Sequence, residues 1–355
     1  MQQLSNLDCF FLAKELQASL AGSFFENFYD YGEGIFRLRF SKQSVLVDLK
    51  GFAFLSEDGS FPLPPKQPSS FAMLLRKRLA SAKLESVKQS GFDRILEFCF
   101  SSKQGRHFVV VELFGKRGNL LLLDEHKKII KPFRKVSYAA RSLADGEAYA
   151  MPPSEKKHPL ELKESDLHGS GRIVSFLSKQ TSLAPFYLEE ACARAGMPLD
   201  KDASSLNASE KKDLLSAFAS LFERPSPRVF LKARKPFAFS SIELKKFSDA
   251  ECVPLEFVSE AVAVYYSSIE SEVSLHQGEG DLEFQLQSQE KALAQFEMKT
   301  TEAQESGKWV FENHDLVEEL IQAAREKNQS KLDAFAKKHG LRLRMEKQFL
   351  EIEKA

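Results

Sequence analysis

The sequence predicts an α+β fold, because one long strand-rich region is followed by helical segments. Apolar and polar side chains alternate in short runs between residues 35 and 132, whereas residues 171–222 and 282–324 show the apolar spacing of helices. Apolar residues make up 43% of the 355 residues, which is enough to form a packed core. At about 100–200 residues per domain, this length predicts two or three structural units.

The first element is a predicted helix at the N-terminus. Ser5 and Asp8 have the spacing of a capping box, in which two side chains satisfy backbone N–H groups of the first turn. Leucine and phenylalanine then recur at helical spacing as far as Leu16, and Gly22 is a suitable stop. The sequence therefore predicts a helix that ends before residue 22.

Short strands and a second helix come next. From Ile35 the pattern has period two, which is typical of a half-buried strand. Prolines at 62–68 precede a predicted helix over 70–79, which has an apolar stripe and carries cations on its opposite side. The strands predicted in this region lie at 35–40, 45–47, 52–55, 84–89, 93–100, 107–114, 118–124 and 127–132.

The second half of the chain is predicted to be mainly helical. A proline-rich, charged connector at 151–166 leads into helices with an N-cap at Asn207 or Ser209, and a basic extended segment covers 223–240. A heptad register then runs from Leu282 to Ala324, and its weak position at Gly307 predicts a bend there. We therefore predict four parts: a strand-rich domain at 1–150, a helix-hairpin module with its connector and return segment at 151–255, a coiled-coil arm at 256–330 and a short tail at 331–355.

The net charge of zero conceals two oppositely charged regions. Residues 62–142 contain 17 Lys and Arg against 6 Asp and Glu, and residues 250–330 contain 5 against 17. Such asymmetry indicates a polyanion-binding surface in the first region and a solvated acidic element in the second. Basic strands that merely balance acidic helices explain the composition equally well, so both interpretations stay open at this point.

The sequence contains no motif for catalysis or for a cofactor. GxSxG, HExxH, the Walker A loop and a GxGxxG that follows a strand are all missing. No histidine lies two to five residues from another histidine or a cysteine, so no metal site is expected. The cysteines are isolated, which argues against a disulfide framework and fits a reducing cytosol; they are Cys9, Cys99, Cys192 and Cys252. We therefore expect a soluble intracellular protein that is not an enzyme and has no cofactor.

The basic region contains the candidate binding residues. Lys and Arg neutralise phosphates, and aromatic rings stack on unpaired bases. Phe71 and Phe114 are interpreted as core residues, whereas Phe92 stays open. Asp93 and Arg94 follow a Ser-Gly turn and open a strand, where they can contact RNA or form an ordinary strand-end salt bridge. From the pair alone, the salt bridge is the favoured interpretation.

Three blocks of the sequence resemble the NFACT family, whose members include NEMF, bacterial RqcH and proteins once named fibronectin-binding protein A. They are LSNLDCFFLAKEL at 4–16, PPKQPSSFAMLLRKRLASAKLESVKQSGFDRILEF at 64–98 and ELFGKRGNLLLLDEHKKII at 112–130. Residues 165–225 also resemble the family's helix-hairpin module, which is similar to the helix–two-turn–helix of DNA-repair glycosylases. The resemblance implies an NFACT-N domain similar to the N-terminal domain of those glycosylases.

The resemblance also implies a function. Family members bind a large ribosomal subunit that is obstructed by peptidyl-tRNA, recruit tRNA, and support mRNA-independent addition of a C-terminal tail to the stalled chain. In the family, residues that match Asp8, Asp93 and Arg94 are associated with tRNA handling. The capping box explains Asp8 equally well. The expected contacts with tRNA or rRNA are Asp8, Arg76, Lys77, Arg78, Lys88, Gln89, Asp93, Arg94, Lys116, Arg117 and Asn119.

Two departures from the family pattern limit what the resemblance implies. The chain ends at Ala355 without the family's C-terminal NFACT-R domain, so either that domain is on a separate chain or this chain is a fragment, and the resemblance does not imply tail elongation by this chain alone. It also begins Met1-Gln2-Gln3, without the Pro-Glu start that glycosylases use as nucleophile and acid, so glycosylase chemistry is not expected. We expect a cytoplasmic factor that positions tRNA while the ribosome transfers the peptide, with no membrane partner. The alternative is a coiled-coil adaptor whose contact with RNA is incidental.

Overall fold

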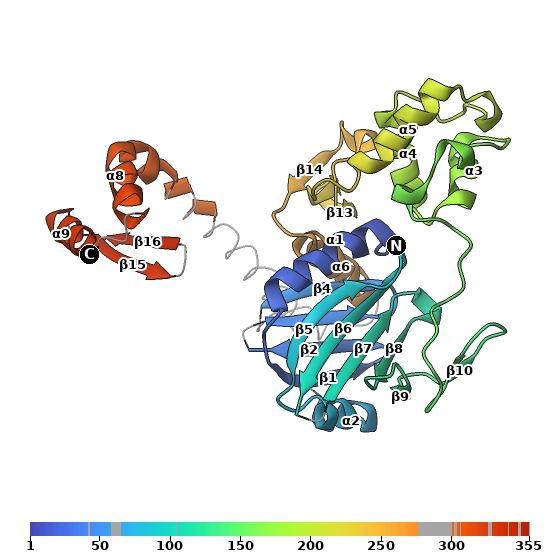
Figure 1. The fold of residues 1–355 in the computed structure, drawn as a ribbon, viewed down its shortest axis with the longest axis horizontal. Helices are drawn as coiled ribbons and strands as arrows, with labels where there is room; N and C mark the ends of the chain where they lie inside the picture. The colour runs from blue at the N-terminus through green and yellow to red at the C-terminus, as the bar shows by residue number, and fades with distance from the viewer. Residues whose placement is uncertain are drawn as a thin grey trace. The chain divides into compact units, whose positions relative to one another are not determined.

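The computed structural model describes residues 1–41, 43–57, 65–103, 105–275, 300–301, 304–305, 307–325, 329–339, 341–346 and 349–354 (Figure 1). The chain divides into two compact units, Met1–Glu279 and Gly280–Ala355. Each unit contains both helices and strands, so the predicted α+β class is confirmed.

Two antiparallel sheets form most of the N-terminal part of the first unit. Aromatic rings join them, because Phe100 of the second sheet lies 5.8 Å from Phe25 and 6.2 Å from Phe40 of the first, measured between ring centroids. The first sheet has the order β1 (Phe25–Gly32), β2 (Ile35–Phe40), β3 (Gln43–Asp48) and β4 (Phe52–Glu57). The second has the order β5 (Lys83–Gln89), β6 (Ile95–Ser102), β7 (Gly105–Glu112), β8 (Asn119–Leu123) and β9 (Ile129–Pro132).

Two helices pack on this pair of sheets. The predicted capping box is present at the start of α1 (Asn6–Leu20), where Ser5 and Asp8 each accept from the other's backbone N–H. Helix α2 (Ser70–Arg78) packs against β1 and buries Phe71 between the rings of Phe28 and Phe133. Both helices lie where the sequence predicts them.

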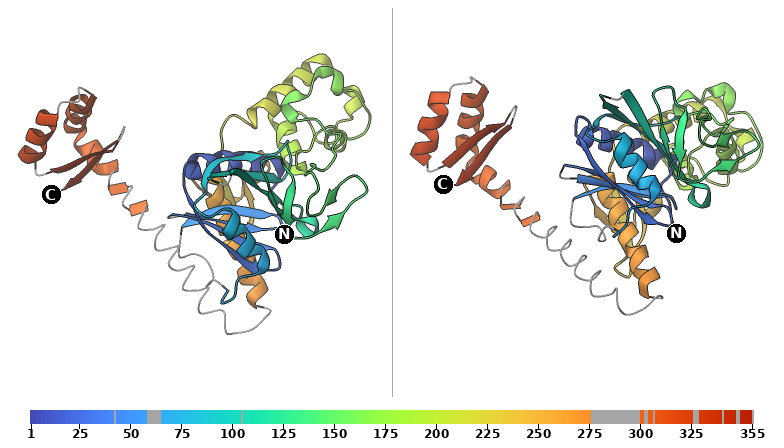
Figure 2. Two further views of the ribbon diagram at one scale, coloured as in Figure 1. Left: turned by 60° about the horizontal axis from the view of Figure 1, so that its bottom comes forward. Right: turned by 90° about the horizontal axis from the view of Figure 1, so that it is seen from below.

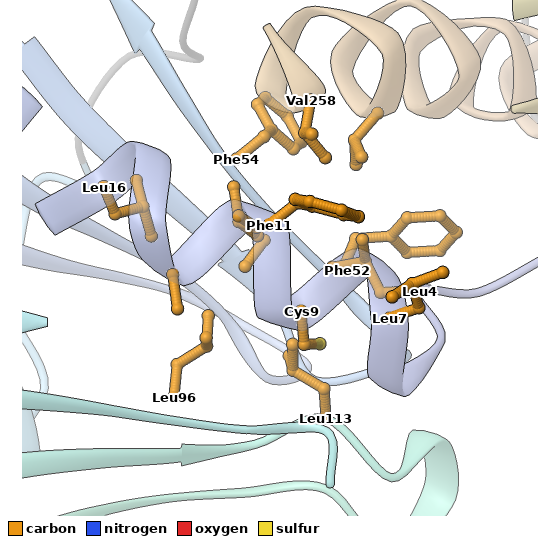
Figure 3. Packing of buried hydrophobic residues seen from close by; sticks show 14 of the residues in the cluster. Leu4, Leu7, Cys9, Phe11, Leu16, Phe52, Phe54, Leu96, Leu113 and Val258 are labelled. Carbon is orange, nitrogen blue, oxygen red and sulfur yellow. The ribbon is translucent and has the colours of Figure 1, made fainter. Parts of the chain in front are cut away.

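Helix α1 is enclosed by apolar side chains from both sheets. Figure 3 shows its residues between Leu96 and Leu113 on one side and Phe52 and Phe54 on the other, with Val258 of α6 (Val258–Leu275) nearby. All these side chains belong to one core. The position of α1 is therefore fixed by contacts with segments that are far apart in the sequence.

A group of short helices follows the connector. Asn207 is the N-cap of α5, which confirms the first of the two predicted capping residues. The elements are η2 (Pro159–Glu161), η3 (Glu164–Asp166), α3 (Ile173–Gln180), α4 (Pro185–Arg194), η4 (Ala203–Ser205) and α5 (Ala208–Ser220). They lie within the predicted helix-hairpin module, which we call the helical module.

The remainder of the first unit connects the helical module back to the sheets. A three-stranded antiparallel sheet has the order β13 (Lys235–Ser240), β12 (Arg228–Lys232) and β14 (Glu251–Pro254), with η5 (Lys245–Phe247) between β13 and β14. Helix α6 packs against β4 and β13, as the views in Figure 2 show, and buries Tyr265 and Tyr266. This helix lies in the range for which the sequence predicts a coiled coil, but it belongs to the core of the first unit.

A small hairpin covers the outer face of the second sheet. It consists of β10 (Val136–Ser137) and β11 (Ser142–Leu143). Its Arg141 donates two hydrogen bonds to Glu112 of β7, at 2.6 and 2.9 Å, and Tyr149 donates a third at 2.9 Å. The Glu112 side chain is fully buried and that of Arg141 is 6% exposed, so this ion pair lies inside the protein.

The second unit differs from the predicted arm and tail. Residues 307–312 are helical, and the helix is interrupted at Asn313 before α8 (His314–Arg325) begins. Residue 306 lies outside the described residues, so the bend or pause predicted near Gly307 stays a prediction. The stretch predicted as a short tail contains most of α9 (Gln329–His339) and the hairpin of β15 (Leu341–Glu346) and β16 (Phe349–Lys354). The buried Leu320 and Leu332 pack with Trp309. Residues 276–299, which contain the first part of the heptad register, lie outside the described residues.

Candidate nucleic-acid interface

The turn between β5 and β6 contains the Asp93–Arg94 pair. Gly91 has φ +60°, a left-handed conformation that glycine adopts without strain. The Gln89 side-chain amide donates to the backbone oxygens of Asp93 (2.8 Å) and Asn6 (2.7 Å). The Asn6 side chain in turn donates to the backbone oxygen of Phe92 (2.7 Å). Gln89 is thus a structural link that fixes this turn to the start of α1.

The side chains of Asp93 and Arg94 do not form an ion pair with each other. The Asp93 carboxylate accepts from the backbone N–H of Arg94 (2.7 Å). The Arg94 guanidinium donates to Oε1 of Gln3 (2.8 Å) and lies 5.7 Å from the Phe114 ring centroid. The strand-end salt bridge that the pair alone favours is therefore not formed, and within the described residues no carboxylate pairs with Arg94.

Two further cations lie in a loop that follows β7. Lys116 and Arg117 are exposed and belong to η1 (Gly115–Arg117). The loop lies close to the chain around residue 49, because a Cβ atom on Gly118 would lie 2.4 Å from the backbone oxygen of Leu49. A Cβ on Gly115 would lie 3.2 Å from Nε2 of Gln3, the side chain that also binds Arg94. We call Arg94, Lys116 and Arg117 the basic rim.

Asn119 and Asp8 are buried. Asn119 is 1% exposed; its side chain donates to the backbone oxygen of Arg134 (2.8 Å) and accepts from the Arg134 backbone N–H (3.0 Å). Asp8 is fully buried and accepts at Oδ1 from Tyr187 Oη (2.5 Å) and Ser241 Oγ (2.6 Å). Both side chains therefore have structural roles, and the RNA contacts expected of them stay predictions.

The aromatic rings of the basic region are packed, not free to stack on bases. Phe71 is buried and Phe114 packs at the outer face of the second sheet, as predicted. Phe92, which the sequence left open, packs on His158 of the connector (4.5 Å) and Phe222 after α5 (5.6 Å). The turn that contains Asp93 therefore contacts the helical module as well as α1.

The remaining predicted residues lie elsewhere. Lys88 is exposed on β5, and its Cα pairs with that of Glu97. On α2, Arg76 donates to the backbone oxygen of Phe28 (2.8 Å), whereas Lys77 and Arg78 are exposed. In the part of the chain that the structure describes, neither of these two exposed cations forms an ion pair.

The structure separates the α2 cations from the basic rim. Arg78 is close enough to His107, near the start of β7, to lower its pKa. Lys116 and Arg117 come after the end of the same strand. Since strands rise about 3.4 Å per residue, the six steps from His107 to Leu113 span roughly 20 Å. Arg78 and the basic rim therefore lie toward opposite ends of β7.

His107 makes the stability of this region depend on pH. Burial and then the Arg78 charge lower its pKa below the ordinary 6.5, so the folded chain favours the neutral ring. As pH falls through 6.5, the unfolded chain takes up the proton first, and the stability that is present above this pH is lost. We expect His107→Asn to flatten the dependence of unfolding free energy on pH between about 7.5 and 5.5. Urea unfolding followed by circular dichroism measures this; the exposed His126→Asn is the control, and parallel curves for wild type and His107→Asn would contradict it.

The three buried cysteines of the first unit are not activated nucleophiles. Burial raises the pKa of the Cys99 and Cys192 thiols to about 11, and burial and the Asp8 charge raise that of Cys9 further. A thiol with a raised pKa has less of the reactive thiolate. The described residues hold no group of three or more His, Cys, Asp or Glu side chains that could bind a metal ion. The arrangement is suited to holding an anion by charge and hydrogen bonds.

Comparison with known proteins identifies the family. The model for the NFACT N-terminal and middle domains matches residues 12–339. This chain belongs to the NFACT family. Among curated relatives of the NFACT chain, the archaeal Rqc2 homolog aRqcH of Methanocaldococcus jannaschii is 31% identical over 283 residues, which are 74% of this chain and 42% of the archaeal protein.

Two further relatives are shorter matches. The ribosome quality control complex subunit 2 of Saccharomyces cerevisiae is 38% identical over 135 residues, 36% of this chain and 12% of that protein. The human ribosome quality control complex subunit NEMF is 34% identical over 135 residues, 37% of this chain and 12% of that protein. The NFACT chain thus matches less than half the length of each of these relatives.

Solved structures show the same fold. The fibrinogen binding protein from Staphylococcus aureus matches with a TM-score of 0.62 and 21% identity, covering 74% of this chain and 98% of that one. The N-terminal part of the fibronectin/fibrinogen-binding protein from Streptococcus suis gives 0.61 and 20%, covering 74% and 99%. The strand-rich NFACT-N domain is therefore confirmed, while its predicted likeness to glycosylases stays a prediction.

Several residues of the site were not predicted from the sequence. Gln3 binds Arg94, Arg134 binds the backbone oxygen of Gly118, and Tyr187 binds Asp8. Gln3 precedes the first helix and Tyr187 lies in a helix of another module, so no local pattern marks either. Arg134 belongs to the basic region, and its charge was the one available signal.

Proposed function

We propose that this chain is a cytoplasmic ribosome-associated quality-control factor. It would bind tRNA on a large ribosomal subunit obstructed by peptidyl-tRNA and support mRNA-independent C-terminal tailing of the stalled chain. The ribosome would supply peptidyl transfer, so the chain itself would be a binding factor and not an enzyme. Membership of the NFACT family supports this proposal, as does the similarity to the archaeal Rqc2 homolog and to the yeast and human ribosome quality control complex subunits.

The observation that carries the proposal is the basic rim. Arg94, Lys116 and Arg117 come from two separate loops, and within the described residues none of them has an acidic partner. Gln3 contacts Arg94 and lies against Gly115, so the two loops are held together. Unpaired cations on a fixed surface are what phosphate binding requires.

The α2 cations would make a second, separate contact. Arg78 acts on His107 near the start of β7, whereas the basic rim lies near the end of this strand, roughly 20 Å along it. A single tRNA backbone or two different RNA segments, one of them rRNA, can supply phosphates at this spacing.

The proposal predicts that the double variant Asp93→Ala/Arg94→Ala loses tRNA. Removing Arg94 eliminates a charged contact. Removing Asp93 breaks the hydrogen bond that its carboxylate accepts from the Arg94 backbone N–H within the turn. We expect at least a tenfold loss of co-purified tRNA at low salt, since a hydrogen bond to a charged group contributes about 1.5–3 kcal/mol. The measurement is sequencing and quantification of RNA retained on the purified chain.

Its matched control is Lys212→Ala/Asp213→Ala on α5. This pair is also adjacent and opposite in charge, so the net charge changes equally; its side chains are exposed, whereas those of Asp93 and Arg94 are partly buried. The control variant should retain tRNA as the wild type does. Equal retention by both double variants would show that the Asp93–Arg94 turn is not the tRNA contact.

A protein adaptor is the second candidate function. On the helix at 307–312, Phe311 is 85% exposed and Val310 is 45% exposed, which suits contact with a protein. Adaptor binding should survive RNase and high salt, whereas phosphate binding weakens steeply with salt. Retained protein partners without enrichment of rRNA or tRNA would favour the adaptor.

A further inference from the structure

The first turn of α1 touches two parts of the molecule at once. On one side, Gln3 binds the Arg94 guanidinium and Asn6 exchanges hydrogen bonds with Phe92 and Gln89 of the adjoining turn. On the other side, Asp8 binds Tyr187 of the helical module and Ser241, the residue after β13. Only four residues of chain, Leu4 to Leu7, therefore lie between Gln3, which holds Arg94, and Asp8, which holds the helical module.

The Asp8 side chain is completely enclosed by donors of this chain. Its Oδ1 accepts from Tyr187 Oη at 2.5 Å, from Ser241 Oγ at 2.6 Å and from the Ser241 backbone N–H at 3.3 Å. Its Oδ2 accepts from the Ser5 backbone N–H at 2.8 Å. The Asp8 carboxylate thus accepts four hydrogen bonds from this chain and has no exposed surface.

The partners of Asp8 are themselves fixed. Tyr187 is fully buried in α4, and its hydroxyl also lies 3.1 Å from Ser240 Oγ. The Ser240 hydroxyl accepts from the Ile242 backbone N–H at 3.2 Å. Burial and the Asp8 charge raise the pKa of Tyr187 well above its ordinary value, so the phenol stays protonated and can donate. The network thus joins α1, α4 and the end of β13.

The contact between the helical module and the Arg94 turn has a second part. Phe92 in the turn packs on Phe222, which follows α5, and on His158. Phe10 of α1 packs on the same Phe222 ring at 5.1 Å. If the module moved relative to α1, the packing around Phe92 would change with it.

We infer that Asp8 serves RNA binding as a positioning residue, by joining the helical module to the first turn of α1 and so fixing the turn that holds Arg94. This inference rests on the proposed function and differs from a direct contact between Asp8 and tRNA. In the direct case only Asp8 matters. In the positioning case Tyr187 and Ser241 matter as well, although neither contributes a charge.

Substituting Asp8 itself does not separate the two cases, because both predict a loss. The informative variants are Tyr187→Phe and Ser241→Ala, each of which removes a hydroxyl that donates to Asp8. The matched control is Tyr266→Phe, because Tyr266 is also buried and its hydroxyl also donates to a buried aspartate, Asp48, at 3.1 Å. All variants are made in the full chain.

The first readout is affinity for tRNA at low salt. We expect Tyr187→Phe and Ser241→Ala to weaken binding by roughly 2- to 30-fold, the range over which residues outside a site alter it, and Tyr266→Phe to bind as the wild type does. In the Arg94→Ala background, Tyr187→Phe should have no further effect, because it acts through Arg94. Wild-type affinity of both hydroxyl variants, or an equal loss in Tyr266→Phe, would overturn the inference.

The second readout needs no RNA and therefore tests the positioning even if the proposed function fails. The backbone N–H of Ser90 donates to Ile95 (2.9 Å) and that of Leu113 donates to Arg94 (2.9 Å). Tyr187→Phe should speed hydrogen exchange at these two amides, and Tyr266→Phe should not. Unchanged exchange would overturn the positioning role, whereas a wild-type chain that binds no tRNA would overturn the proposed function alone. If Tyr187→Phe does not fold, Ser241→Ala supplies both readouts.

Discussion

Arg141→Ala is expected to lower the unfolding free energy of the first unit by about 3–5 kcal/mol, the cost of breaking a buried ion pair from one side. The Glu112 carboxylate would be left fully buried, with the Tyr149 hydroxyl as its remaining side-chain donor. A buried charge without its partner pays the desolvation cost without the compensating attraction. Urea unfolding of the purified variant, followed by circular dichroism, measures the loss.

Two further variants test the physical reason. Glu112→Leu/Arg141→Leu removes both charges and should recover most of the stability, because an apolar pair replaces a buried ion pair at little cost. Arg106→Ala breaks an exposed pair with Glu85 and should cost less than about 1 kcal/mol. A cost of that small size for Arg141→Ala would show that water reaches Glu112.

Phe100→Ala is expected to destabilise the same unit by about 3–5 kcal/mol. The Phe100 ring is 1% exposed and lies between the two sheets, parallel to Phe40 and edge-on to Phe25. Truncation leaves a cavity between the two sheets. Because close-packed interiors relax only partly, the sheets do not fill this cavity completely. Calorimetry of thermal unfolding would measure the decrease.

The comparison for this variant is Phe24→Ala. Phe24 is 55% exposed and precedes β1, so little apolar surface is lost from the core when it is truncated. Its loss of stability should stay below about 1 kcal/mol. If the two substitutions cost the same, the sheets would not be held together through Phe100.

Most of the fold of the first domain could be predicted from local patterns. Strands β2 to β9 lie where alternation and turn residues predict them, because side chains in a strand alternate between the two faces. Strand β1 was missed, and its register shifts at residues 25–27 and 30–32 explain why, since each shift interrupts the period of two. The β15–β16 hairpin lies in the range that the sequence predicts as a short tail.

The site was predicted less completely than the fold. Motifs located Asp93, Arg94 and the loop with Lys116, because these residues are close together in sequence blocks. The residues that hold them come from far along the chain, since Gln3 is 91 residues from Arg94 and Ser241 is 233 residues from Asp8. Such contacts depend on how the helices and strands of the first unit pack together, and a local sequence pattern does not contain this information.

The location of Trp309 decides how unfolding can be observed. The chain has one tryptophan, and it packs with Leu320 and Leu332 in the second unit. Intrinsic tryptophan emission therefore reports on the environment of the second unit, because the first unit contains no tryptophan. If emission and circular dichroism give different midpoints in one titration, the two units unfold as separate cooperative systems, and a single unfolding free energy no longer describes the chain.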